Sequence, residues 1–171
     1  MKIVLLGYMG SGKSTIGKIL AADLKLNFLD LDSYIETAEG KTVKAIFEDK
    51  GEIYFRKKEA ASLREILKSE DNFVLSIGGG TPCYANNMQA IVDQTKNSFY
   101  LKNSITELVK RLSSEKSERP LVQNIADDEL SEFIGKHLFE RSFFYSQASQ
   151  KVVGDAKSPQ EVMQEIKELL R

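Results

Sequence analysis

The residues with the clearest chemical meaning form a glycine-rich run near the start of the chain, Gly7-Tyr8-Met9-Gly10-Ser11-Gly12-Lys13-Ser14. This run follows the phosphate-binding pattern G-x-x-x-x-G-K-[ST] and stands between an apolar strand-like segment and a helix-like one, as that pattern requires. Glycines let backbone N–H groups converge on a polyphosphate, and the positive end of the following helix favours the same anion. The run therefore predicts binding of a nucleoside triphosphate, with a glycine-rich turn that binds nothing as the alternative.

Several side chains near this loop could take part in phosphoryl transfer. The ammonium of Lys13 can reach the β- and γ-phosphates, and the hydroxyl of Ser14 can bind Mg²⁺. Asp30 and Asp32 follow a short strand-like segment and, two residues apart in extended chain, would share one side. One carboxylate could orient water on Mg²⁺, and the other could accept a hydrogen bond from a substrate hydroxyl. The alternative is that Asp32 caps a helix beginning at Ser33 while Asp30 is a solvated charge.

A second glycine run, Gly78-Gly79-Gly80, ends the apolar strand-like segment at 73–77. Three glycines there would let the backbone approach a ligand closely and donate N–H groups to it. A tight turn without function is the alternative. The segment does not end in an acidic residue, so we expect Mg²⁺ to be supported by Ser14, the phosphates, water and Asp30.

Three arginines are candidates for binding anions. Arg56 and Arg141 lie in helix-like segments among aromatic residues, and such poorly hydrated arginines suit bidentate capture of a carboxylate or phosphate. For either residue alone, a surface ion pair is the more ordinary role. Arg119 lies in a polar loop before Pro120, where it could swing over the phosphates and offset charge in the transition state, or remain a solvated charge.

The order of expected elements predicts an α/β fold that gathers these residues. Strand-like segments lie at 2–6, 27–29, 73–77, 98–101 and 151–153, and helix-like segments lie at 13–25, 32–38, 42–47, 51–69, 86–95, 104–112, 127–147 and 159–170. The strands are solidly apolar, as expected when helices cover both faces of a parallel sheet. Ligands of such sheets collect at the carboxyl ends of the strands.

The amino-acid composition excludes several classes of protein and of binding site. With 171 residues the chain fits one compact domain, and 24 basic against 25 acidic residues provide no field that would recruit nucleic acid. One cysteine and one histidine exclude an intrachain disulfide, a cysteine-based zinc cluster and a histidine-rich metal site. No apolar run is long enough to span a membrane and no leader pattern precedes the first strand, so we expect a cytoplasmic protein without a membrane partner.

Taken together, these motifs resemble those of the shikimate kinases. The resemblance covers nearly the whole chain and rests on Gly7 to Thr15, Asp30-Leu31-Asp32, Gly51-Glu52 with Phe55-Arg56, Gly78-Gly79-Gly80, Glu118-Arg119-Pro120-Leu121, and Arg141 with Tyr145. It implies a nucleoside-monophosphate-kinase-like, three-layer α/β/α P-loop fold with a five-stranded parallel sheet. The chain would form a single kinase domain over 1–171, with a substrate-binding helical region at about 32–60 and a lid loop at about 113–124.

The resemblance also implies an activity, transfer of the γ-phosphoryl group of ATP to the 3-hydroxyl of shikimate on the route to aromatic amino acids. Mg²⁺ would be the cofactor, ATP and shikimate the ligands, and the protein a monomer. The implied ATP-binding residues are Gly10, Ser11, Gly12, Lys13, Ser14, Thr15, Arg111, Arg119 and Lys157, with Pro159 as another neighbour of the base. Ser14 would bind the metal, and Asp30 would support it through water.

The remaining implied roles concern the acceptor. Shikimate would be held by Asp32, Arg56, Gly79 and Arg141, with Phe47 and Phe55 as apolar walls, and the catalytic residues would be Asp32 as proton acceptor, Lys13 and Arg119. Thr81-Pro82-Cys83 departs from the small aliphatic residues expected after the glycines, so contacts there cannot be transferred from the family. Two alternatives remain, another small-molecule P-loop kinase of the gluconate or nucleoside-monophosphate type and a non-catalytic nucleotide-binding module.

Overall fold

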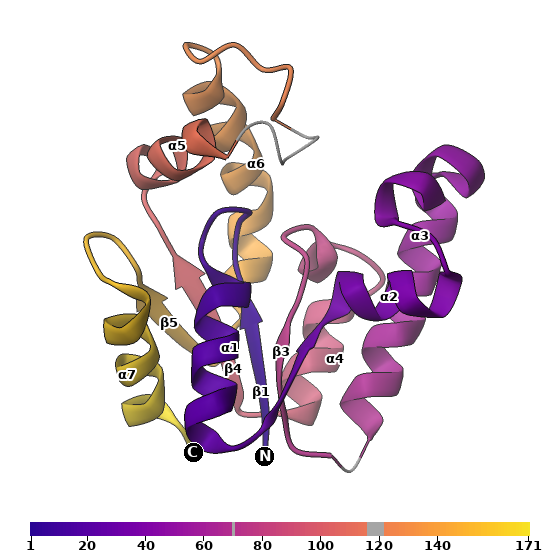
Figure 1. Cartoon of the computed structure of the whole chain (residues 1–171), viewed down its shortest axis with the longest axis vertical. Coiled ribbons are helices and arrows are strands. Elements are labelled where there is room, and N and C mark those ends of the chain that lie inside the picture. The colour runs from indigo at the N-terminus through magenta and orange to yellow at the C-terminus, as the bar shows by residue number, and fades with distance from the viewer. Residues whose placement is uncertain (70, 116–121) are drawn as a thin grey trace.

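The computed structural model describes residues 1–69, 71–115 and 122–171, and within them five strands form one parallel sheet (Figure 1). The strands are β1 (Lys2–Leu6), β2 (Asn27–Asp30), β3 (Phe73–Ser76), β4 (Asn97–Lys102) and β5 (Gln150–Val153). Their order across the sheet is β2-β3-β1-β4-β5, and each neighbouring pair is parallel. The five-stranded parallel sheet expected from the sequence is therefore confirmed.

The described helices lie close to the segments expected. They are α1 (Lys13–Leu24), α2 (Leu31–Glu39), α3 (Val43–Lys68), α4 (Asn87–Gln94), α5 (Ile105–Ser114), α6 (Leu130–Tyr145) and α7 (Pro159–Leu169). A short 3₁₀ turn, η1 (Thr81–Cys83), was not expected. Local sequence explains several boundaries. At α7, for example, Ser158 and Glu161 form a reciprocal capping box and Pro159 occupies the first helical position.

Two apolar clusters cover the two faces of the sheet. Ile3 and Leu5 of β1 face α1 and α7, whereas Val4 and Leu6 face the cluster that includes α3 and α4, and all four side chains are 0% exposed. The solidly apolar strand thus divides its side chains between two helical layers. The expected three-layer α/β/α arrangement is the one observed.

Helix α3 differs from the expectation of two separate helices at 42–47 and 51–69. It is one element with a sharp break in geometry at Gly51, whose φ of 80° and ψ of 173° are not helical. Glycine adopts this positive φ without the steric cost that a side chain would bring. The expected interruption is real, but it is a kink within one helix rather than a loop between two.

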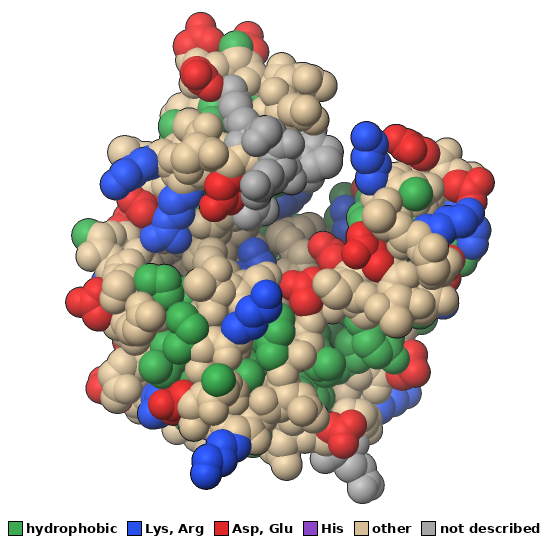
Figure 2. All heavy atoms as spheres, viewed as in Figure 1, with side chains coloured by type: hydrophobic (Ala, Val, Ile, Leu, Met, Phe, Trp, Pro, Cys, Tyr) green, Lys and Arg blue, Asp and Glu red, His purple; other side chains and the backbone are tan. Residues whose placement is uncertain are grey.

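A third apolar cluster joins α5 and α6 beyond the carboxyl end of β1. It contains Tyr8, Leu108, Leu112, Val122, Leu130 and Ile134. Figure 2 shows the molecule hollowed between this part and the part built from α2 and α3, with acidic side chains gathered on the α2–α3 side. The carboxyl ends of β1, β2 and β3 point toward this hollow (Figure 1). No helix in the described portion is both long and apolar enough to span a bilayer.

Candidate active site

The phosphate-binding loop joins β1 to α1 and is shaped by glycines. Gly10 has a φ of 78°, and Gly12, which caps the start of α1, has a φ of 89°. Glycine adopts these positive φ values without steric cost, and they allow the tight turn that joins β1 to the first turn of α1. The Nζ of Lys13 donates to the carbonyls of Gly7 and Tyr8, each at 2.9 Å. These bonds hold the ammonium group against the loop that carries the phosphate-binding pattern.

Ser14 is linked to the ends of two neighbouring strands. Its hydroxyl donates to Oδ2 of Asp30 at 3.0 Å and lies 3.4 Å from the Ser76 hydroxyl. Asp30 and Ser76 are register partners at the carboxyl ends of β2 and β3, so the parallel sheet brings both groups to α1. Asp30 is therefore not a solvated loop charge, which was the alternative to a functional role. Its Oδ1 accepts from the Ser33 N–H at 3.3 Å and caps α2.

Asp32 lies in the first turn of α2, so the expectation that it shares an extended segment with Asp30 was wrong in local geometry. The helix begins at Leu31, one residue earlier than expected, because Asp30 rather than Asp32 is the cap. Burial raises the pKa of Asp32 to about 6, and the negative charges of Asp30 and Glu59 add to the rise while Lys13 opposes it. Asp32 is thus a carboxylate whose proton affinity suits a general base near neutral pH.

A polar cavity of about 200 Å³ connects these groups. Its wall includes Lys13, Ser14, Asp30, Asp32, Ser76, Gly78 and Gly79. The phosphate loop, both carboxylates and the glycine run therefore share one space, as expected from the rule that ligands collect at the carboxyl edge of a parallel sheet.

The three consecutive glycines lie against three different charged side chains. A methyl group added at Gly78 would lie 3.5 Å from Oδ1 of Asp32, one at Gly79 would lie 3.4 Å from Nη1 of Arg141, and one at Gly80 would lie 3.1 Å from Nη2 of Arg56. The lack of side chains here lets a carboxylate and two guanidinium groups approach the same short stretch of backbone. Arg56 and Arg141, which are distant in sequence, therefore converge on neighbouring residues.

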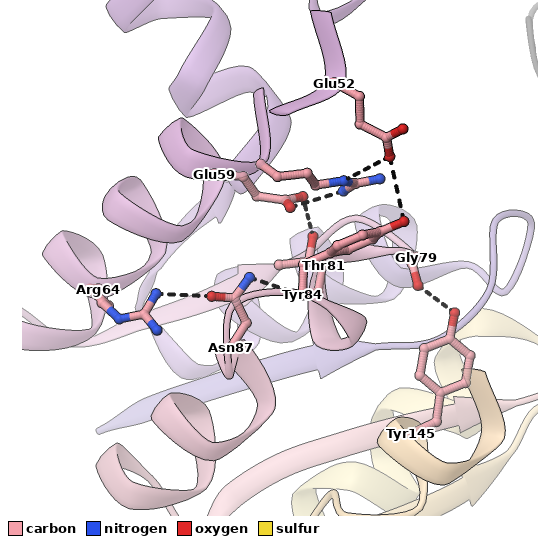
Figure 3. A network of polar contacts seen from close by, with 9 residues as sticks. Glu52, Glu59, Arg64, Gly79, Thr81, Tyr84, Asn87 and Tyr145 are labelled. Carbon is pink, nitrogen blue, oxygen red and sulfur yellow. Dashed lines mark hydrogen bonds and ion pairs between the residues drawn. The ribbon is translucent and has the colours of Figure 1, made fainter. Parts of the chain in front are cut away.

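Arg56 is held on several sides. Its Nη1 donates to Oε2 of Glu59 at 2.9 Å, and its Nε lies 3.4 Å from Oε1 of Glu52. The guanidinium carbon lies 4.1 Å from the centre of the Tyr84 ring, a distance typical of cation–π stacking. Figure 3 shows Glu52 and Glu59 of α3 facing Thr81 and Tyr84 in the turn that follows β3. Nη2, the atom nearest Gly80, makes no hydrogen bond within the described residues.

Arg141 is held differently. Its guanidinium carbon lies 5.5 Å from the centre of the Tyr8 ring, and no carboxylate among the described residues forms an ion pair with it. Tyr145, one turn further along α6, donates its hydroxyl to the carbonyl of Gly79 at 2.5 Å. An arginine without a carboxylate partner, packed beside aromatic rings, is well placed to bind an external anion.

Comparison with known proteins shows the family to which the chain belongs. A model of the family described as shikimate kinase matches residues 9–171. A protein named shikimate kinase from Flavobacterium psychrophilum is 49% identical over 169 residues, which cover 99% of this chain and 98% of the relative. This chain belongs to the shikimate kinase family.

Solved structures of shikimate kinases have the same fold. The enzyme from Bacteroides thetaiotaomicron is 38% identical and superposes with a TM-score of 0.91, covering 99% of this chain and 97% of that one. A shikimate kinase from Acinetobacter baumannii, solved in complex with shikimate, is 30% identical with a TM-score of 0.87, covering 98% of this chain and 91% of that one. The chain is accordingly an ATP-dependent kinase with the P-loop fold of the shikimate kinases.

A second cavity, of about 340 Å³, lies on the other side of the phosphate loop. Arg111, Lys157 and Pro159, the expected neighbours of the adenine base, all line it together with Gly10, Gly12 and Thr15. Arg111 is fixed by Glu107, whose Oε1 accepts from its Nε at 2.7 Å. Arg119, the third expected catalytic residue of this shikimate kinase, lies outside the described residues.

Two residues near Arg56 were missed by the sequence argument, Glu59 and Tyr84. Glu59 is an acidic residue one helical turn after the buried Phe55 and one before the buried Leu63. A charged residue within this apolar stripe of the helix was the signal that could have identified it.

Phe47 and Phe55, the expected apolar walls of the acceptor site, pack together with ring centres 4.6 Å apart. Neither is among the described residues lining the polar cavity.

Proposed function

We propose that this shikimate kinase binds shikimate against the glycine run and transfers the γ-phosphoryl group of ATP to its 3-hydroxyl. The observation that carries the assignment is the convergence of Asp32, Arg141 and Arg56 on Gly78, Gly79 and Gly80. The first two glycines line the same cavity as Lys13, so an acceptor held there would lie beside the terminal phosphate.

Each group at this site has a distinct proposed role. Arg56 and Arg141 bind the substrate carboxylate, which fixes the ring, and Asp32 binds a ring hydroxyl and accepts its proton. Phosphoryl transfer needs positioning and charge compensation more than covalent chemistry, and this arrangement provides both without a nucleophilic side chain. Gly79 contributes its backbone, with its carbonyl already fixed by Tyr145.

The nucleotide occupies the phosphate loop and the cavity lined by Arg111 and Lys157. The loop residues Gly10, Ser11, Gly12, Lys13, Ser14 and Thr15 bind the phosphates, and Arg119 adds positive charge from the lid. The hydroxyl of Ser14 is a hard oxygen ligand of the kind that suits Mg²⁺, and the carboxylate of Asp30 lies 3.0 Å from it. When bound, Mg²⁺ would neutralise phosphate charge, with Asp30 supporting it through water.

The further features proposed for the chain follow from the same assignment. Residues 1–171 act as a single kinase domain, with a substrate-binding region at about 32–60 and a lid at about 113–124, as a monomer in the cytoplasm without nucleic acid or membrane partners. The near balance of 24 basic and 25 acidic residues supports the absence of a nucleic-acid partner.

A coupled assay of ADP release tests the proposal. We expect turnover with ATP, Mg²⁺ and shikimate, and none above background with gluconate or AMP as the acceptor. Phosphorylation of gluconate or AMP in preference to shikimate would overturn it, and nucleotide binding without turnover on any acceptor would indicate a binding module. Identification of the phosphorylated hydroxyl by NMR tests the assignment to the 3-position.

A further inference from the structure

The turn after the glycine run places one hydroxyl against the carboxylate that orients Arg56. Thr81 is 0% exposed, and its Oγ1 donates to Oε1 of Glu59 at 2.6 Å (Figure 3). Arg56 binds the other oxygen, Oε2, at 2.9 Å. Each oxygen of this carboxylate therefore has its own donor.

The hydrogen bond from Thr81 matters because the carboxylate that accepts it is buried. Glu59 is only 1% exposed, so water cannot replace a lost partner, and a buried carboxylate oxygen without a donor is strongly disfavoured. Without the hydroxyl, the carboxylate would gain by rotating toward Arg56, because the guanidinium group can donate to both oxygens at once. That rotation would draw the guanidinium group away from Gly80.

The backbone of Thr81 is held in place by a second set of hydrogen bonds. Its carbonyl accepts from Nδ2 of Asn87 at 2.9 Å, and Oδ1 of Asn87 accepts from Nη1 of Arg64 at 3.0 Å. Nη2 of Arg64 also donates to the carbonyl of Ala85 at 2.6 Å. Since Arg64 and Glu59 both belong to α3, the turn is attached to that helix at two points and its hydroxyl has a defined direction.

We propose that Thr81 is a positioning residue for the acceptor substrate, and that its hydroxyl, acting through Glu59, holds Arg56 in the orientation that binds the substrate carboxylate. This inference rests on the proposed role of Arg56. It gives a role to the residue at which the sequence departs from the expected small aliphatic type.

Steady-state kinetics of Thr81→Val, which replaces the hydroxyl with a methyl group of similar size, test the proposal. We expect the KM for shikimate to rise about five- to tenfold, with kcat and the KM for ATP within about twofold of wild type. Thr81→Ser keeps the hydroxyl and should restore the KM for shikimate. Thr95→Val is the matched control, because Thr95 donates to the carbonyl of Lys2 at 2.6 Å at the opposite end of β1. It should lower the thermal midpoint without changing either KM.

A double-mutant cycle with Arg56→Ala separates this inference from the proposed function. Thr81→Val should add nothing to the effect of Arg56→Ala, because both act on the same contact. An unchanged KM for shikimate in Arg56→Ala would overturn the proposed role of Arg56. A raised KM in Arg56→Ala with a normal one in Thr81→Val would overturn the positioning role alone, as would equal increases in both substrate KM values or full additivity in the cycle. If Thr81→Val yields too little folded protein, Thr81→Ala removes the same hydroxyl and the same comparisons apply.

Discussion

The hydroxyl of Tyr145 donates to the carbonyl of Gly79 at 2.5 Å, which ties the end of α6 to the middle of the glycine run (Figure 3). Arg141 lies one turn earlier on the same helix and against the same glycine. Burial raises the pKa of Tyr145, so the hydroxyl remains a donor throughout the working range. The bond therefore attaches the end of the helix that carries Arg141 to the glycine run.

Removing this bond should affect both stability and substrate binding. We expect Tyr145→Phe to lower the free energy of unfolding by about 1 kcal/mol and to raise the KM for shikimate several-fold, because α6 is no longer fixed to Gly79. Urea denaturation and steady-state kinetics measure the two effects. Tyr100→Phe is the control, since its ring centre lies 5.0 Å from that of Tyr145 and its hydroxyl makes no hydrogen bond within the described residues. A normal KM in Tyr145→Phe would show that the helix is held by other contacts.

The carboxylate of Asp32 should carry most of the base catalysis. Asp32→Asn keeps the shape but cannot accept a proton, so kcat should fall about 10²–10⁴-fold while ATP affinity is retained. In the wild type, kcat/KM should decrease as the pH falls below about 6, because the base is then protonated. A pH–rate profile and isothermal titration with ATP check both points, and a near-normal kcat would remove Asp32 from catalysis.

The same substitution should make the protein more stable. The folded protein holds the Asp32 proton more tightly than an unfolded chain, in which the pKa is 3.8, so wild-type stability falls as the pH rises through the interval from 3.8 to about 6. Asparagine does not ionise, so the Asp32→Asn variant does not lose stability in this way. It should be more stable than wild type by about 1–3 kcal/mol near pH 8. The difference should shrink toward pH 4, and a constant difference across this range would contradict the raised pKa.

The position of the Arg56 guanidinium group should depend on the absence of a side chain at Gly80. A methyl group at Gly80 would lie 3.1 Å from its Nη2, so Gly80→Ala should displace the guanidinium group and raise the KM for shikimate about tenfold. The control is Gly135→Ala on α6, where the added methyl would make an ordinary 3.6 Å contact with Ile105. This control should stabilise the helix by up to about 1 kcal/mol with both KM values unchanged.

Lys13 should be required for turnover but not for folding. Lys13→Met removes the ammonium group expected to bind the transferring phosphate, and kcat should fall about 10²–10³-fold or more. Lys18→Met, on the exposed side of the same helix, is the matched control and should behave as wild type. Activity of Lys13→Met within tenfold of wild type would falsify the assignment of the phosphate loop.

Asp30 has two separable roles, as helix cap and as metal support. Asp30→Asn should keep the cap on α2, since asparagine caps as well as aspartate does, whereas Asp30→Ala should lose about 1 kcal/mol of stability. Both variants should raise the Mg²⁺ concentration needed for half-maximal velocity. Equal Mg²⁺ requirements in the wild type and both variants would confine Asp30 to the cap.

The placements that could be predicted from the sequence depend on local pattern and on topology. Lys13 and Ser14 belong to a contiguous motif, and the proximity of Asp30 and Asp32 to them follows once the strands are parallel. The alternative in which Asp32 caps the helix was wrong, because Asp30 is the cap; the two are equally good capping residues and nothing local decides between them. The contacts of Thr81 could not be foreseen, because they join residues 22 positions apart through packing of α3 against the turn.

The residues around the polar cavity and the glycine run, on the acceptor side of the site, carry a nearly even balance of charge. Three are basic (Lys13, Arg56 and Arg141) and four are acidic (Asp30, Asp32, Glu52 and Glu59). With Arg56 partly neutralised by Glu52 and Glu59, we expect this side of the site to project little field into solution, so that electrostatic steering of an anionic acceptor should be weak. Encounter with a small acid should depend on ordinary diffusion, and its rate should vary little with ionic strength.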